Sequence, residues 1–157
     1  MIISSVTHNG RTHYNVDTAT TTLPGQMLLA AAQTMFSNQI DTAAGNARAA
    51  FVSPGSYIDQ EYLLAKQEAA DWLANGKDEN AIPSSVQDHI DMFGVSAEAA
   101  ATEIVTTAEQ WELALGAIRS ARLGGKAAVQ RAETIEAKEA AAKQAIEQLK
   151  RYRPPEK

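Results

Sequence analysis

The residues best suited to metal chemistry are His8, His13 and Asp17, near the N-terminus. The two histidines flank Asn9-Gly10, a dipeptide typical of a hairpin turn, so they could lie across a hairpin from one another. With Asp17, the only nearby carboxylate, they would form a His/carboxylate ligand set. Solvated turn histidines are the more ordinary interpretation, and we expect no metal here.

A second polar group surrounds His89, with Asp88 and Asp91 beside it. On a short helix these neighbours point in different directions and do not converge on one ion. Ser84 and Ser85 follow a proline, so they are better interpreted as capping residues than as nucleophiles. We expect these residues to form the polar outer face of this short helix.

The carboxylates Asp59, Glu61, Glu68 and Asp71 invite an acid/base interpretation. The first two are two residues apart and face different sides of a helix, and no apolar pocket is evident that would raise a carboxyl pKa. Gly124-Gly125-Lys126 follows a helix and lacks the upstream strand of a phosphate-binding loop. We therefore expect neither an enzyme nor a cofactor.

Charge and composition exclude further classes of function. The net charge is −5, and residues 57–125 carry twelve acidic but only four basic side chains. The basic Lys150-Arg-Tyr-Arg stretch complements the negative end of a helix and is a weak nucleic-acid signal. There is no cysteine, and the apolar run 27–32 is far shorter than the ~20 residues of a membrane span. We expect a soluble protein with neither nucleic acid nor membrane as a partner.

The first third of the chain differs from the rest. Residues 1–24 are rich in Thr, Ser and β-branched residues, which predicts a short β-hairpin or an extended arm. Two strands alone are marginal in water, so the hairpin should need a partner sheet or another chain to hold it. One helix of about three turns is expected over 26–36. Residues 37–55, with Gly45 and Ser53-Pro-Gly, fit either a second short helix or an irregular arm, and we interpret them as a connector.

The remaining residues are typical of helices. One is expected from Ile58 to a stop at Asn75-Gly76, a second between Pro83 and Gly94, and a third from a Ser96 cap to Gly124-Gly125. An Ala-rich helix over 126–152 would follow. It could pack laterally on its own copies or fold back on the third helix, and we prefer the second arrangement. The fold class is therefore mainly α, a small bundle of about four to five helices with an N-terminal hairpin.

Large apolar side chains in the helices are the candidate packing or interface residues. Trp72 and Trp111 are the largest, and they would anchor one small core or, alternatively, an exposed interface. The full set is Trp72, Trp111, Tyr62, Phe93, Ile118 and Leu123.

Residues 57–150 show an individual pattern. An acidic helix leads to a Pro-containing turn, then to a helix with a Trp and an Ile-Arg-x-x-Arg-Leu run, then to an Ala-rich helix. This resembles a helical module common in structural and tail-associated proteins of tailed bacteriophages. The segments that carry the resemblance are Tyr57-Ile-Asp-Gln-Glu-Tyr-Leu-Leu-Ala-Lys-Gln-Glu-Ala, Ile82-Pro-Ser-Ser-Val-Gln, Ala100-Ala-Thr-Glu-Ile, Trp111, Ala117-Ile-Arg and Arg122-Leu-Gly-Gly-Lys.

The resemblance implies a virion component of the tail, baseplate or fibre, assembled in the host cytoplasm. It would act by contacts with other phage structural proteins and as a homo-oligomer in a symmetric assembly. The alternative is a tail or fibre assembly chaperone absent from the particle. We expect residues 1–56 to attach to partners, 57–125 to form the acidic helical module, and 126–157 to supply the Ala-rich helix and a basic tail.

Overall fold

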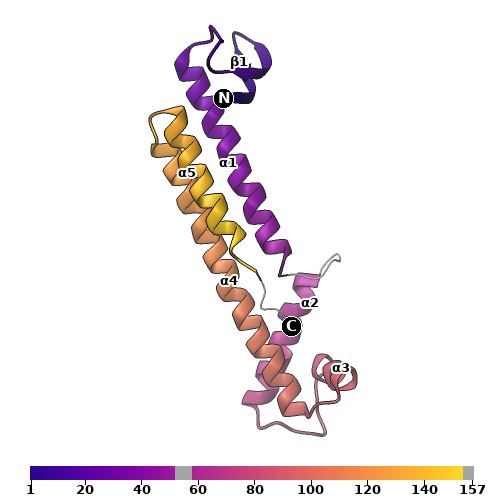
Figure 1. The fold of residues 1–157 in the computed structure, drawn as a ribbon. Helices are drawn as coiled ribbons and strands as arrows, with labels where there is room; N and C mark the ends of the chain where they lie inside the picture. Colours follow the sequence, from indigo (N-terminus) through magenta and orange to yellow (C-terminus); the bar gives the residue numbers. More distant parts are fainter. Residues whose placement is uncertain (52–57, 154–157) are drawn as a thin grey trace. The chain divides into compact units, whose positions relative to one another are not determined.

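The structure is a computed structural model that describes residues 1–51 and 58–153. Helices predominate, and a two-stranded antiparallel sheet lies at the N-terminus (Figure 1), which confirms the predicted fold class. The elements are β1 (Ile2–His8), β2 (Arg11–Asp17), α1 (Gly25–Ala49), α2 (Ile58–Ala74), α3 (Ser84–Phe93), α4 (Ala97–Arg131) and α5 (Ile135–Lys150).

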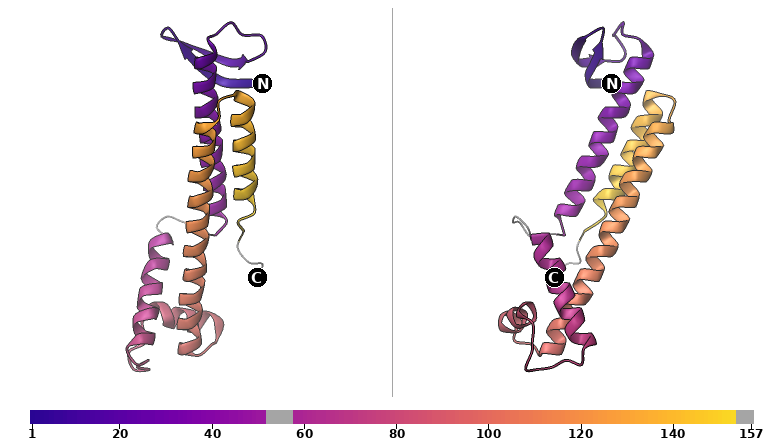
Figure 2. Two further views of the ribbon diagram at one scale, coloured as in Figure 1. Left: turned by 90° about the vertical axis from the view of Figure 1, so that its left-hand side faces the viewer. Right: turned by 180° about the vertical axis from the view of Figure 1, so that it is seen from behind.

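The chain divides into two compact units, and the boundary lies inside α4. Unit 1 consists of Met1–Ala50 together with Ala117–Lys157, and unit 2 of Phe51–Gly116. The segments expected from the sequence ended at residues 56 and 125 instead. Unit 1 is thus formed from the two ends of the chain, because α1 packs against α5. Figure 2 shows these helices running side by side in both views.

The hairpin forms around the predicted turn. Asn9 and Gly10 have φ of 48° and 73°, the left-handed pair that a type I′ turn requires. The strands pair with Ile3 opposite Val16, and both side chains are buried. A partner sheet or another chain was expected to stabilise this hairpin, but β1 packs instead on helix α1 of the same chain. Asn15, with φ 51°, interrupts the regular strand geometry.

Helix α1 is longer than the sequence predicted. A three-turn helix over 26–36 and a connector over 37–55 were expected, but α1 runs for 25 residues to Ala49. Its buried side chains recur at spacings of three and four on one face, which outweighs the low helix propensity of Gly45. They are Leu28, Ala32, Phe36, Ile40, Ala44 and Ala47. The expectations for Ser53-Pro-Gly and for Tyr57 concern residues outside the described ranges.

Helix α4 does not end at Gly124-Gly125, as predicted, but continues to Arg131. The turn lies at residues 132–134, and Thr134 caps α5 by accepting a hydrogen bond from the Ala137 amide at 3.1 Å. The last helix does fold back on α4. A Cβ placed on Gly125 would lie 2.3 Å from the Ala145 Cβ, so Gly125 permits a close helix contact. Gly125 therefore allows close helix packing and does not end α4.

One buried cation supports this contact. Lys138 in α5 is only 4% exposed, and its Nζ donates to the Val129 carbonyl at 2.8 Å and to Gln33 Oε1 at 3.3 Å. Carbonyls in the last turn of a helix lack an intrahelical partner. Lys138 therefore satisfies the C-terminal end of α4 and links all three helices of unit 1.

Asp41 in α1 connects that helix to α4. Its carboxylate accepts from Arg122 Nη1 at 2.9 Å and from Lys126 Nζ. The Lys126 hydrogen bond is the main reason that the pKa of Asp41 lies below its ordinary value, and Arg122 adds to the effect. At any pH above the ordinary pKa of an aspartate, the Asp41 carboxylate is therefore charged and accepts hydrogen bonds from both cations.

Unit 2 has a small core of its own between α2, α3 and the first turns of α4. Ala69, Trp72, Val86, Ala100 and Ala101 are buried in it. The predicted ends of α2 and α3 are confirmed. Gly76 and Gly94 have φ of 91° and 68°, as expected for helix C-caps.

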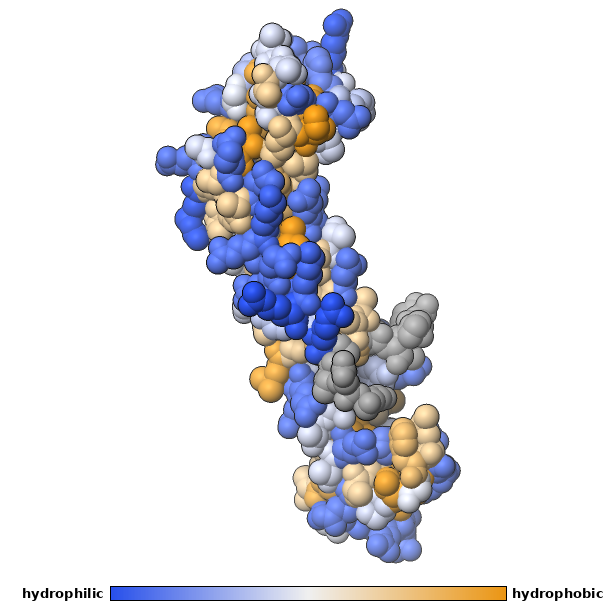
Figure 3. All heavy atoms as spheres, viewed as in Figure 1, coloured by the Kyte–Doolittle hydropathy of each residue, from blue (hydrophilic) through white to orange (hydrophobic). Residues whose placement is uncertain are grey.

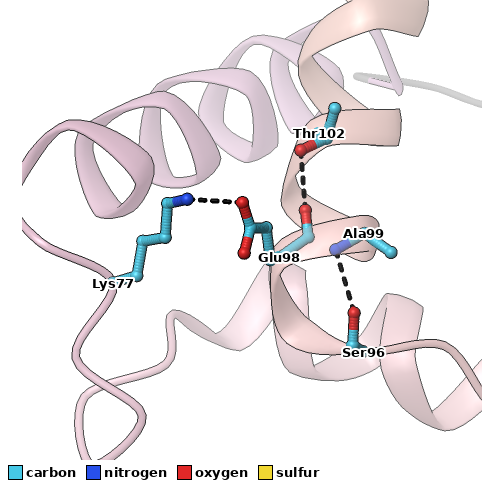
Figure 4. Close-up of polar contacts among 5 residues, drawn as sticks. All are labelled: Lys77, Ser96, Glu98, Ala99 and Thr102. Carbon is cyan, nitrogen blue, oxygen red and sulfur yellow. Dashed lines mark hydrogen bonds and ion pairs between the residues drawn. The ribbon is translucent and has the colours of Figure 1, made fainter.

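Ser96 caps α4 as predicted. Its Oγ accepts from the Ala99 amide at 3.3 Å, and Lys77 forms an ion pair with Glu98 beside it (Figure 4). Thr102 Oγ1 donates to the Glu98 carbonyl at 2.7 Å. Each helix in the described ranges is too short or too polar to cross a bilayer.

A methyl group at Gly125 should weaken unit 1. Gly125→Ala overpacks the contact with Ala145 and should lower the free energy of unfolding by about 1–3 kcal/mol. Gly124→Ala is the matched control, because its Cβ would meet open space and should add up to about 1 kcal/mol through helix propensity. Urea unfolding followed by circular dichroism measures both. Equal stability of the two variants would contradict the close contact.

The Asp41 ion pairs should make stability depend on pH. Because the folded pKa of Asp41 is lowered, its contribution is complete above the ordinary pKa and is lost as pH falls through the folded pKa. We expect Asp41→Asn to cost about 1 kcal/mol or less at about pH 7, the range for partly exposed pairs, and less below about pH 3. Urea unfolding at both pH values measures this. In an Arg122→Gln/Lys126→Gln background the same change should have little effect, and an undiminished cost there would contradict the pairing.

Candidate interaction surfaces

The groups weighed for metal chemistry do not assemble. In the hairpin His8 pairs with Arg11 while His13 pairs with Val6, so they occupy different positions along the ladder. Asp17 accepts from the Ala19 amide at 3.0 Å and lies near the N-terminal amine. Within residues 1–51 and 58–153, no cluster of His, Asp and Glu could hold a metal ion.

The polar groups of unit 2 connect its helices. Glu68 Oε2 accepts from Ser85 Oγ at 2.6 Å and from its amide at 3.3 Å, so a carboxylate from α2 caps the positive end of α3. The ring of His89 lies 3.3 Å from Glu103 Oε2 and packs on Phe93, with ring centroids 4.5 Å apart. These contacts connect α3 to α2 and to α4.

The two tryptophans have different surroundings. Trp72 is 7% exposed in the core of unit 2, and its Nε1 donates to the Asp78 carbonyl at 2.9 Å. Trp111 lies further along α4 and is half-buried, and its buried Nε1 has no hydrogen-bond partner within the described ranges. The sequence could not separate these environments.

The other candidate residues divide between core and surface. Ile118 is fully buried in unit 1. Tyr62, Phe93 and Leu123 are 42%, 53% and 41% exposed, so part of each side chain lies at the surface.

The two units carry opposite net charge. Unit 1 has twelve Lys and Arg against seven Asp and Glu, a net charge of +5, whereas unit 2 has two against twelve, a net charge of −10. The sequence indicated an acidic middle. The structure strengthens the contrast, because residues 117–125, with Arg119 and Arg122, belong to the basic unit.

A groove of about 640 Å³ runs along unit 1 between α1 and α5. Met35, Ala43 and Ile146 supply partly exposed apolar area, and polar side chains of α1 line the groove as well. Lys150, Tyr152 and Arg153 contribute from the C-terminal side. Small residues on α1 leave space for another helix to approach closely.

The C-terminal end of this groove is positively charged. Lys150 of the lining forms an ion pair with Glu147, whose pKa is below the ordinary value, first because Lys150 donates to it and also because Lys150 and Arg151 are positively charged. Arg153 adds another cation to the lining. Sequence reasoning missed the groove, because its two walls are about a hundred residues apart in the chain.

Unit 2 exposes apolar side chains beside acidic ones. Leu63 and Leu64 on α2 are 54% and 58% exposed. Gln67 and Asp71, three and seven residues after Leu64, share its helix face and are also exposed. Hydrophobic side chains also reach the surface near α3 and, in unit 1, near the hairpin (Figure 3).

Comparison of the chain with protein-family models, with curated proteins and with solved structures finds no match.

Replacing each tryptophan by Phe should distinguish their roles. Trp72→Phe loses a buried hydrogen bond and leaves a cavity, so it should destabilise unit 2 by about 1–3 kcal/mol. Trp111→Phe removes a buried donor that lacks a partner and should change stability by less than about 1 kcal/mol. Thermal unfolding by circular dichroism measures both. A larger loss for Trp111→Phe would contradict these environments.

Proposed function

We propose that this protein is a structural component of a tailed-bacteriophage particle, in the tail, baseplate or fibre region, that acts through protein–protein contacts. The setting comes from the sequence pattern of residues 57–150, which resembles a helical module of such proteins. The proposed role in protein–protein contacts is supported by the exposed surfaces of the two units.

The observation that carries the contact role is the pairing of exposed apolar area with charge of one sign. Unit 1 has a groove with apolar walls and a basic end, and unit 2 has two exposed leucines on an acidic helix. Apolar anchors supply most binding energy at protein interfaces, and surrounding charges select the partner. Both features are present on a chain of only 157 residues.

The basic residues of unit 2 are few and already paired. Lys66 and Lys77 are its only Lys or Arg residues, and both are in internal ion pairs, with Glu112 and Glu98. Of the ten other acidic residues, Glu103 lies beside His89, and none has a further Lys or Arg of its own unit to neutralise it. A basic partner would relieve their mutual repulsion.

The test is quantitative mass spectrometry of purified particles from infected cells. We expect the protein in mature virions at a constant copy number that fits a symmetric assembly. Enrichment on immature tails or free fibres, followed by loss from mature particles, would support an assembly chaperone instead. Absence from both would contradict the proposal.

A further inference from the structure

We propose that copies of this chain associate head to tail, with α2 of one copy bound in the α1/α5 groove of the next. This deepens the proposed function by naming the partner, and it relies on that function only for the setting. The groove belongs wholly to unit 1 and the leucine face wholly to unit 2, so each copy has both halves of the contact.

The groove and helix α2 match in length. The α1 wall of the groove extends from Met35 to Ala50, about 24 Å at the rise of an α-helix. Helix α2 has 17 residues and is about 25 Å long, whereas α3 has only 10 residues. A helix in the groove would join α1 and α5 in four-helix-bundle packing.

The side chains that line the groove are complementary to the exposed face of α2. Along α1 the groove has small or short polar side chains, among them Thr42, Ala43 and Asn46, which let a helix approach closely. Leu63 and Leu64 would meet Met35 and Ile146, the partly exposed apolar side chains of the groove lining. Gln67 would lie among the polar side chains.

The opposite net charges of the two units favour a head-to-tail contact over a symmetric one. Unit 2 has a net charge of −10, and the groove belongs to the unit with net charge +5. Two grooves or two α2 helices would bring like charges together, which disfavours symmetric pairing. Opposite charges favour a contact between unlike surfaces, which extends to a ring or a filament.

The first measurement is sedimentation velocity of the purified full-length chain over a range of concentrations. We expect association at low salt that weakens at high salt, because exposed charges are screened within about 10 Å at 0.1 M. A chain that stays monomeric at every concentration and salt would overturn the proposal.

Two variants each remove one half of the contact. Leu63→Ser/Leu64→Ser removes the anchors on α2, and Thr42→Glu/Asn46→Glu places acidic groups in the groove. All four positions are exposed, so the fold should persist by circular dichroism. Each variant should weaken self-association by more than about tenfold.

Two control variants alter exposed positions outside both surfaces. They are Leu113→Ser on α4 in unit 2 and Ala30→Glu on α1 in unit 1. Both should associate as the unmodified chain does. Equal weakening by the controls and by the surface variants would overturn the assignment of the surfaces.

Mixing the two surface variants tests the direction of the contact. One variant retains the groove and the other retains the α2 face, so a head-to-tail contact predicts a 1:1 heterodimer that grows no further. A mixture that stays monomeric, while the unmodified chain associates, would overturn the head-to-tail geometry. Association in solution and presence in virions are separate results, so this inference and the proposed function can fail independently.

Discussion

The close approach of α5 to α4 at Gly125 and Ala145 is the constraint on which unit 1 depends. Much of its core is alanine, and a methyl group buries little apolar area. Such a core is stable only where helix backbones come near enough for short side chains to touch. Once α5 is held there, it lies beside α1, and these two helices form the groove.

Sequence patterns predicted the elements with local end signals. The turn at Asn9-Gly10, the stop at Gly76 and the Ser96 cap each depend on residues a few positions apart, and each is present. The same local reasoning was wrong for Gly124-Gly125 and for the length of α1. There, burial against distant parts of the chain outweighed the low helix propensity of glycine, a cost of about 1 kcal/mol per residue.

The candidate surfaces were only partly predictable. Tyr62 and Phe93 stood out by residue type, but exposure depends on which neighbours cover a side chain, and spacing along one helix does not contain that information. The groove required knowing that residues 35–50 pack near 146–153. The acidic character of the middle segment was visible. The basic character of the opposite unit required its two distant segments to be joined.

This division of charge contributes little to folding and is informative about partners. Surface ion pairs stabilise a fold by at most about 1 kcal/mol each, and an excess of one charge destabilises the unit that carries it. A chain selected for stability alone would intersperse its charges. Here both lysines of unit 2 hold α4 in place, Lys66 from α2 and Lys77 from the turn after it, while most acids remain at the surface. Retaining such an excess is more readily explained by selection for a basic partner surface than by the needs of the fold.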